Sequence, residues 1–293
     1  MRHPSTAPRG LFRAGANLGL AVALAILLAG CAGTPPSSST TGSSAAPATS
    51  EIVLASTTST QDSGLFKVLI PAFEKDNPTY TVKVVAVGSG EALKLGENKD
   101  ADVLLVHSPK AEVSFVASGF GEYRKQVMYN DFVIVGPSAD PAGIKGDTKA
   151  SDAFKKIAAA SATFVARGDG SGTDTKEQSI WTSATVTPKG QAWYLSTGQG
   201  MGEVLKLTSE KQGYTLSDRA TYLTMKDSLK LEILDEGDKA LFNQYGVIPV
   251  AGAKNVAGAH AFADWITGPK GQAVVRSFGV EKFGRPLFIP NAQ

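Results

Sequence analysis

Short apolar runs alternate with amphipathic stretches in the chain from residue 51 onward. Three runs have the composition of strands, and the last is apolar throughout, which is typical of a buried parallel strand: EIVLA, TVKVVAV and ADVLLVH. Between them, GLFKVLIPAFEKDN has apolar residues at helical spacing and ends at Asn77, before Pro78, and GSGEALKLGENK predicts a turn and a short helix. This order predicts an α/β domain with a mostly parallel sheet.

A second alternating series follows a long predicted strand, YNDFVIVGP. Its helices are predicted at KASDAFKKIAAAS, DTKEQSIWTSA and GEVLKLTSEK. Strands are predicted at TFVAR, YTLSDRATYL, LEILDEG and YGVIPV, and a strand or an extended segment at AWYLSTG. The last helical stretch, GAHAFADWITGPKGQAVVRSFG, predicts two helices that separate at Gly268 and Pro269.

The simplest arrangement of these elements is two α/β lobes, with the C-terminal helices packed back on the first. The chain is expected to cross near residues 131–136 and to return near residues 245–250. This assigns residues 51–132 and 246–293 to lobe 1 and residues 133–245 to lobe 2. Because open parallel sheets bind ligands beyond the carboxyl ends of their strands, we expect a ligand between the lobes, held by strand-to-helix loops.

The first fifty residues differ in composition from the rest. Three arginines precede an apolar run at residues 18–28, which is shorter than the about 20 residues that span a bilayer. Residues 1–30 are therefore predicted to be a secretion signal. The following LAGC, which ends at Cys31, resembles the lipobox of bacterial lipoproteins, in which the signal is cut before a lipid-bearing cysteine. The alternative is an ordinary signal or a short membrane anchor with an incidental cysteine.

Residues 31–50 combine the predicted lipid anchor with a flexible tether rich in Ser, Thr, Pro and Ala. Of the 29 basic residues, Arg2, Arg9 and Arg13 lie in the signal, so 26 remain against 27 acids and the folded part is close to neutral. It therefore has no charge signature for nucleic acid. Cys31 is the only cysteine, which excludes a disulfide within the chain and a thiolate metal site.

Four predicted strand-to-helix loops are rich in hydrogen-bond donors: residues 56–64 (STTSTQDSG), 88–91 (GSGE), 167–174 (RGDGSGTD) and 197–203 (TGQGMGE). Small residues let the backbone approach a ligand, and the N–H groups at helix starts attract anions. Helix capping alone also explains each loop, although one cap needs one hydroxyl and the first loop opens with five. Arg167 adds a permanent charge and a fork of donors suited to oxyanions, unless it makes only a structural salt bridge.

The sequence lacks the motifs of the common nucleotide-binding proteins and enzymes. GQGMGE has Glu203 in place of the third glycine of G-x-G-x-x-G, and no P-loop occurs. Ser171 does not fit the G-x-S-x-G motif of hydrolases. The histidines beyond the signal are His107, at a strand end facing the cleft or bonded structurally, and His260, expected on a helix surface. Without a metal motif or a pair of catalytic carboxylates, the chain is predicted to be no enzyme and to hold no cofactor or coordinated metal.

The donor-rich loops and the strands around them resemble a known family. STTSTQDSGL, VVAVGSGEAL, FVARGDGSGTDTKE, WYLSTGQGMG and SFGVEKFGRPLF occur in the family's order within residues 51–290. That family is the tungstate-binding component of bacterial ABC transporters, within the type II periplasmic-binding-protein class. The resemblance implies a two-lobed fold with two crossover segments, which closes on an oxyanion and hands it to a membrane permease.

The resemblance also implies the ligand residues. The family's T-T-T-S motif falls on Ser56, Thr57, Thr58 and Ser59, with serine in place of the first threonine. The implied oxyanion-binding residues are Thr57, Thr58, Ser59, Ser89, Arg167, Ser171, Gly172 and Thr173.

The charge of the ligand restricts the composition of such a site. Tungstate and molybdate are tetrahedral dianions without a proton to donate near neutral pH, so a selective site is expected to present donors only. Two acids near the donors, Asp62 and Asp169, are therefore expected to stabilise a loop or a helix cap and to point away from the ligand. Phosphate keeps a proton and would gain from an acceptor carboxylate.

The combined expectation is a monomeric substrate-binding lipoprotein. It is secreted across the cytoplasmic membrane, is anchored to the outer face of that membrane through Cys31, and delivers an oxyanion, tungstate first, to an ABC transporter permease. A binding protein for molybdate or phosphate is the nearest alternative, followed by a surface lipoprotein without a role in transport or an enzyme. The sequence does not separate tungstate from molybdate, whose size and charge are nearly the same.

Overall fold

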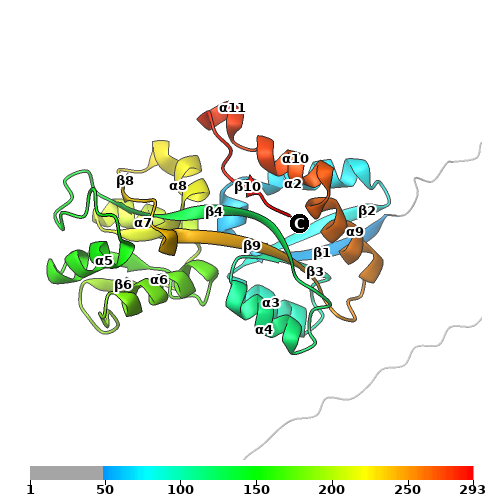
Figure 1. The fold of residues 1–293 in the computed structure, drawn as a ribbon, viewed down its shortest axis with the longest axis horizontal. Coiled ribbons are helices and arrows are strands. Elements are labelled where there is room, and N and C mark those ends of the chain that lie inside the picture. The colour runs from blue at the N-terminus through cyan, green and yellow to red at the C-terminus, as the bar shows by residue number, and fades with distance from the viewer. Residues whose placement is uncertain (1–48, 293) are drawn as a thin grey trace, which may run out of the picture. The chain divides into compact units, whose positions relative to one another are not determined.

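Two long strands, β4 (Lys125–Gly136) and β9 (Phe242–Pro249), run antiparallel and connect two groups of helices and strands (Figure 1). The group that contains the N-terminal strand is lobe 1, and the other group is lobe 2. The computed structural model describes residues 49–292, which belong to one compact unit. The predicted signal, Cys31 and nearly all of the predicted tether lie outside the described residues.

Lobe 1 is a sheet with helices on both faces. Its elements are β1 (Ser50–Thr57), α1 (Thr58–Asp62), α2 (Phe66–Asp76), β2 (Tyr80–Val87), α3 (Ser89–Glu97), β3 (Val103–Val106), α4 (Pro109–Ala117), α9 (Val256–Thr267), α10 (Pro269–Ser277), α11 (Val280–Phe283) and β10 (Ile289–Pro290). β1 pairs in parallel with β2 and β3. Successive residues of β1 point to opposite faces, so Leu54 packs in the core with α2 and α9 and Ala55 in the core with α3 and α4.

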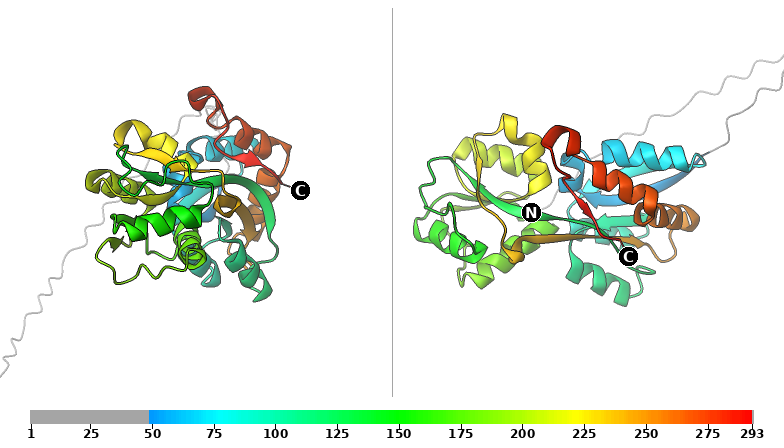
Figure 2. Two further views of the ribbon diagram at one scale, coloured as in Figure 1. Left: turned by 60° about the vertical axis from the view of Figure 1, so that its left-hand side comes forward. Right: turned by 45° about the horizontal axis from the view of Figure 1, so that its top comes forward.

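The C-terminal helices pack back on lobe 1, as predicted from the sequence (Figure 2). The ring of Phe73, on α2, lies edge-on to Phe262 and Trp265 of α9, with centroids 5.2 and 5.5 Å apart. The break between the last two long helices falls at Gly268, and Pro269 occupies the first turn of α10, where its missing N–H is not needed.

Lobe 2 is built on the far half of β4. Its elements are α5 (Ala150–Ala159), β5 (Phe164–Ala166), α6 (Gly172–Ser183), β6 (Tyr194–Ser196), α7 (Met201–Lys211), β7 (Thr215–Asp218), α8 (Arg219–Met225), η1 (Lys226–Ser228), β8 (Glu232–Asp235) and η2 (Lys239–Leu241). β5 and β6 are parallel, whereas β7 and β8 both pair antiparallel with β4. The rings of Phe154, Phe164 and Trp181 pack against one another in its core.

The sequence pattern predicted the parallel strands of lobe 1 correctly. It did not predict the antiparallel pairing that the two crossover strands, β4 and β9, add to the sheet. β9 returns from lobe 2 in the opposite direction, so it pairs antiparallel with β3 and with β4. The prediction of a strand over YTLSDRATYL is half right, because β7 ends at Asp218, whose side chain accepts a hydrogen bond from Thr221 N (2.9 Å) and caps α8. The short helices α1 and α4 were not predicted; α1 has only five residues.

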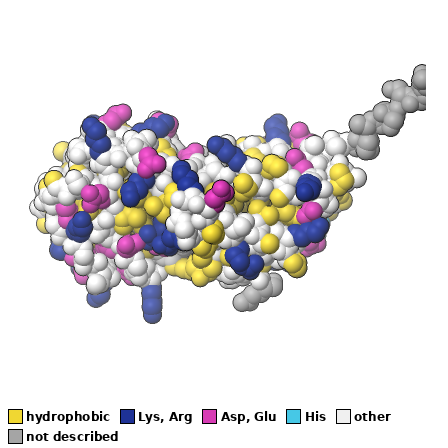
Figure 3. All heavy atoms as spheres, turned by 90° about the horizontal axis from the view of Figure 1, so that it is seen from above, with side chains coloured by type: hydrophobic (Ala, Val, Ile, Leu, Met, Phe, Trp, Pro, Cys, Tyr) yellow, Lys and Arg dark blue, Asp and Glu magenta, His cyan; other side chains and the backbone are white. Residues whose placement is uncertain are grey.

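Charged side chains of both signs are interspersed on the face shown in Figure 3, in keeping with the near-neutral composition of the folded part. The helices within residues 49–292 all fall short of the length and apolar character that a bilayer crossing requires.

Glu177, on α6, is a buried carboxyl in the core of lobe 2. Its Oε1 accepts hydrogen bonds from Trp181 Nε1 (3.0 Å) and Tyr194 Oη (2.7 Å). Burial raises the pKa of Glu177 to about 8, so the protonated form is favoured in the folded chain at neutral pH. The contribution of Glu177 to the stability of the fold is complete below the pKa that this group has in the unfolded chain. It is lost as the pH rises through the pKa that it has in the folded chain.

We expect Glu177→Gln to flatten the pH dependence of stability, because glutamine resembles the protonated side chain. In urea unfolding, the free energy of unfolding of the variant should rise by more than about 1 kcal/mol relative to that of wild type as the pH increases from about 6 to about 9. Glu210→Gln, at an exposed position of α7, should leave that difference unchanged. Equal pH dependence in wild type and Glu177→Gln would contradict the buried, protonated state.

Candidate functional site

Five helices begin where the two lobes meet. Their N-caps are Thr57 for α1, Gly88 for α3, Ser171 for α6, Gly200 for α7 and Asp218 for α8. The first N–H groups of a helix have no partner within the helix, and the helix dipole adds positive potential there. These helix starts therefore bring backbone donors from both lobes to one region of the interface, which favours an anion.

The hydroxyl run of lobe 1, residues 56–59, contains side chains with structural roles and side chains that lie at the interface. Ser56 Oγ donates to Leu105 O (2.5 Å) and belongs to the sheet. Thr57 Oγ1 accepts from Thr60 N (3.3 Å) as the N-cap of α1. Thr58 is half-buried and turns toward lobe 2, and Ser59 Oγ lies 3.1 Å from His107 Nε2. The run is thus more than one helix cap.

Arg167 brings a buried guanidinium to this interface from lobe 2. Only 1% of the residue is exposed. Its Nη2 donates to Thr58 Oγ1 across the interface (2.9 Å) and to Asp169 Oδ2 (2.5 Å). The Nε and Nη1 donors are buried and have no partner among the described residues. Arg167 therefore makes the structural salt bridge and still has donors to offer a ligand.

Two further predicted residues also carry buried hydroxyls without a partner. Ser89 Oγ, at the start of α3, and Thr173 Oγ1, in the first turn of α6, make no hydrogen bond within residues 49–292. Buried polar atoms are nearly always hydrogen bonded in folded proteins, so each exception needs an explanation. Together with Nε and Nη1 of Arg167, they form a set of unsatisfied donors contributed by both lobes.

Glycines allow the lobes to approach closely here. Gly90 N donates to Gly170 O across the interface (3.3 Å). A Cβ at Gly90 would lie 2.8 Å from Gly170 O, and a Cβ at Gly172 would lie 2.6 Å from His107 O. Ser171 is occupied locally, since its Oγ accepts from Asp174 N (3.2 Å). Of the eight predicted residues, all but Arg167 lie at the starts of α1, α3 and α6, and Arg167 lies in the loop before α6.

Asp62 and Asp169, two of the acids in the donor-rich loops, have separate roles. Asp62 Oδ2 accepts from Gly202 N (3.0 Å), in the first turn of α7 in the opposite lobe, and burial raises the pKa of Asp62. Asp169 Oδ1 accepts from Ser171 N (3.2 Å), while its other oxygen holds Arg167. The sequence interpretation expected such loop and cap contacts but not the pairing of Asp169 with the arginine.

Two buried groups near the interface were missed or left open by the sequence interpretation. Asp218 is fully buried, its Oδ2 has no partner within residues 49–292, and burial raises its pKa to about 6. His107 lies between Ser59 and Asn243, with 2.9 Å between Nδ1 and Asn243 Oδ1. Asp218 could have been found as a helix cap directly after a strand. His260 lies on α9 and pairs with Glu122, as expected for a surface histidine.

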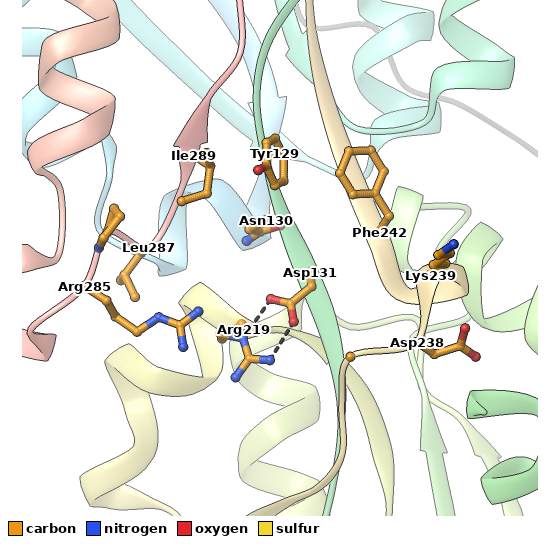
Figure 4. Close-up of a pocket in the computed structure, with 12 residues that line it drawn as sticks. Tyr129, Asn130, Asp131, Arg219, Asp238, Lys239, Phe242, Arg285, Leu287 and Ile289 are labelled. Atoms are coloured by element: carbon orange, nitrogen blue, oxygen red, sulfur yellow. Dashed lines mark hydrogen bonds and ion pairs between the residues drawn. The ribbon is translucent and has the colours of Figure 1, made fainter. Parts of the chain in front are cut away.

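A separate cavity of about 340 Å³ is lined by residues of β4 and of the segment that leads to β10 (Figure 4). None of the eight predicted residues lines it. Its Arg219 is already held by the carboxylates of Asp131 (2.5 Å) and Glu236 (2.6 Å), and the rings of Tyr129 and Phe242 form part of its wall, with centroids 5.0 Å apart. This cavity is less suited to a small dianion than the lobe interface. Residues 49–292 contain no group of three acids, histidines or cysteines arranged for a metal ion.

Comparison with known proteins identifies the family. Residues 40–270 match the PBP superfamily domain. The tungstate-binding protein TupA of Peptoclostridium acidaminophilum is 49% identical over 275 residues, which cover 92% of this chain and 95% of that protein. A putative ABC transporter anion-binding protein of Haloferax volcanii is 46% identical, over 84% of this chain and 73% of that protein. The structure of the tungstate-binding protein TupA from Desulfovibrio alaskensis G20 is 47% identical, with a TM-score of 0.69 over 83% of this chain and 99% of that chain.

These relatives confirm the predicted two-lobed fold of the periplasmic-binding-protein type. They are binding proteins of transport systems, so the chain is an oxyanion-binding component of a transporter and not an enzyme. The chain belongs to the PBP superfamily and, within it, to the family of solute-binding proteins that includes these tungstate-binding relatives.

Proposed function

We propose that the protein binds tungstate between its two lobes and delivers it to the permease of an ABC transporter. The observation that carries this proposal is the set of unsatisfied buried donors: Nε and Nη1 of Arg167, Oγ of Ser89 and Oγ1 of Thr173. A tetrahedral dianion has oxygens on all sides and accepts hydrogen bonds from both lobes at once. The tungstate-binding names of the relatives support tungstate as the first choice of anion.

Hydrogen bonds to one shared anion are sufficient for tight binding. Each hydrogen bond to a charged group contributes about 1.5 to 3 kcal/mol, and micromolar to nanomolar binding requires roughly 8 to 12 kcal/mol after the costs of association. The unsatisfied donors, the hydroxyls of the T-T-T-S-like motif and the N–H groups of α3 and α6 supply enough contacts. Thr57, Thr58, Ser59, Ser171 and Gly172 complete the proposed shell.

The same relatives support a proposal for the location and the partner of the protein. The relatives support a protein that acts outside the cytoplasmic membrane and has a permease as its partner. We extend this to a monomer that is secreted with its signal, lipidated at Cys31 and tethered to the outer face of that membrane. Radiolabelled-lipid incorporation that is lost in Cys31→Ala tests this anchor.

A thermal-shift series with tungstate, molybdate, sulfate, phosphate and a sugar tests the choice of ligand. Tungstate and molybdate should raise the midpoint, because a ligand that binds only the folded state stabilises it by mass action. Competition between these two anions then ranks them. A shift with phosphate alone would instead favour an acceptor group in the shell and contradict the donor-only site.

Arg167→Ala should weaken tungstate binding more than Ser89→Ala, because it removes charge as well as two donors. We expect at least about tenfold more loss of affinity in calorimetry for the arginine variant, since a charged donor contributes more than a neutral one. Lys149→Ala, at an exposed position before α5, is the control. The opposite order of the two site variants would rule out the role assigned to Arg167.

Gly90→Ala should hold the lobes apart, because its Cβ would lie 2.8 Å from Gly170 O. Small-angle scattering with tungstate should show a larger radius of gyration than for wild type, and affinity should fall by about tenfold or more, as donors on both lobes share one anion. Glu91→Ala, the next residue on α3 and exposed, should match wild type. Wild-type scattering and affinity in Gly90→Ala would show that this contact does not limit closure.

A further inference from the structure

A hydrogen-bonded chain of buried side chains leads from the proposed oxyanion site to the crossover strands. Ser59 Oγ lies 3.1 Å from His107 Nε2, and His107 Nδ1 lies 2.9 Å from Asn243 Oδ1. Asn243 Nδ2 in turn donates to Asn130 Oδ1 (2.8 Å) and to Tyr245 Oη (3.3 Å). All five residues are buried. The chain therefore has little contact with solvent in this arrangement of the lobes, and Asn130, which also lines the cavity of Figure 4, is its most exposed member.

The amide of Asn243 fixes the position of the hydrogen on His107. Because Nδ2 of Asn243 has two acceptors, its Oδ1 faces the imidazole and requires a hydrogen on Nδ1. In the neutral ring Nε2 is then bare and accepts the hydroxyl hydrogen of Ser59. Ser59 consequently has only lone pairs to present to Thr57 Oγ1, which lies 3.1 Å away, and to other groups. In this state it cannot donate to an oxyanion.

The charges around His107 do not favour a buried dianion by themselves. Arg167 and Asp169 face it from the loop before α6, and Lys176 from α6 itself. Tyr245 stacks on the imidazole with centroids 4.7 Å apart, and Asp218 lies near that phenol. The guanidinium is already paired with Asp169. Burying two further negative charges beside this pair costs less free energy when another positive charge forms.

We propose that His107 takes up a proton from solvent when the oxyanion binds and thereby turns Ser59 into a donor. This inference rests on the proposed oxyanion-binding function. The added proton forms an N–H bond at Nε2, which donates to Ser59 Oγ, and the Ser59 hydroxyl then points its hydrogen at the anion. The imidazolium keeps its Nδ1–H bond to Asn243, so no other group has to move. His107 is a positioning residue that acts through Ser59.

In the free protein His107 is neutral and can therefore take up a proton when the anion binds. Burial, followed by the charge of Arg167, lowers the pKa of His107 to about 3, so the ring is neutral before the ligand binds. A dianion at the guanidinium offsets the charge of Arg167 and attracts the imidazolium, which raises the pKa in the bound state. A group with a higher pKa in the bound state makes binding stronger as the pH falls. The affinity for tungstate should therefore increase toward lower pH.

Calorimetry of the full-length protein with sodium tungstate, in buffers of different ionisation enthalpy, measures the protons exchanged. Wild type should take up as much as one proton per anion, and its affinity should rise by up to about tenfold per unit as the pH falls from about 8.5 to about 6.5. His107→Gln keeps a hydrogen-bonding side chain but does not titrate, so its uptake should disappear. His260→Gln, which alters the half-exposed histidine of α9, should behave as wild type.

Nitrogen NMR of the wild-type ring tests the same point without a substitution. His107 should show one protonated nitrogen in the free protein and two in the tungstate complex. Tungstate binding without proton uptake, equal uptake in His107→Gln, or a ring that stays neutral in the complex would overturn the role of His107 and leave the proposed function standing. Failure of wild type to bind tungstate, molybdate or any other oxyanion would overturn both.

Discussion

A buried guanidinium at the lobe interface is the feature on which the rest of the site depends. Arg167 is 1% exposed, and a buried charge is stable only when it is paired and hydrogen bonded. Asp169 supplies one carboxylate but leaves Nε and Nη1 of the arginine without partners. The interface therefore contains buried donors without acceptors among the described residues. The hydroxyls and helix starts around it add donors, which increases the same preference for an anion.

Contact between the lobes is arranged on two sides of this guanidinium. On one side Arg167 bonds Thr58 directly, and glycines let α3 approach the loop before α6. On the other side α8 of lobe 2 holds α1, because Thr221 Oγ1 donates to Ser59 O (2.9 Å) and Thr224 Oγ1 donates to Ser63 O (3.1 Å). The five-residue helix α1 is too short to be stable alone. Lobe contact fixes it, so the geometry of the hydroxyl run is a tertiary property.

This dependence explains what the sequence could and could not reveal. Apolar periodicity predicted most helices and the parallel strands, because those elements bury a regular face. It could not predict α1, or the helix after Asp218, since a cap and a contact from another lobe decide them. Residue type and order drew attention to Arg167, Ser89 and Thr173. That their donors lack partners depends on distances that only the folded chain supplies.

Ser59 contacts His107, and His107 contacts Asn243, which is the order of groups in hydrolytic triads. In those triads the histidine takes the proton of a nucleophile, and the third group orients the histidine. The difference lies in the environment of the imidazole. Burial and Arg167 hold the pKa of His107 at about 3, so it is too weak a base to activate a serine at neutral pH. Gly172, at the start of α6, lies against the ring, since a Cβ at this position would be 2.8 Å from His107 Nδ1. The same three groups are thus suited to directing one hydroxyl hydrogen, a task of binding, because burial and the charge of Arg167 leave the imidazole too weak a base for that chemistry.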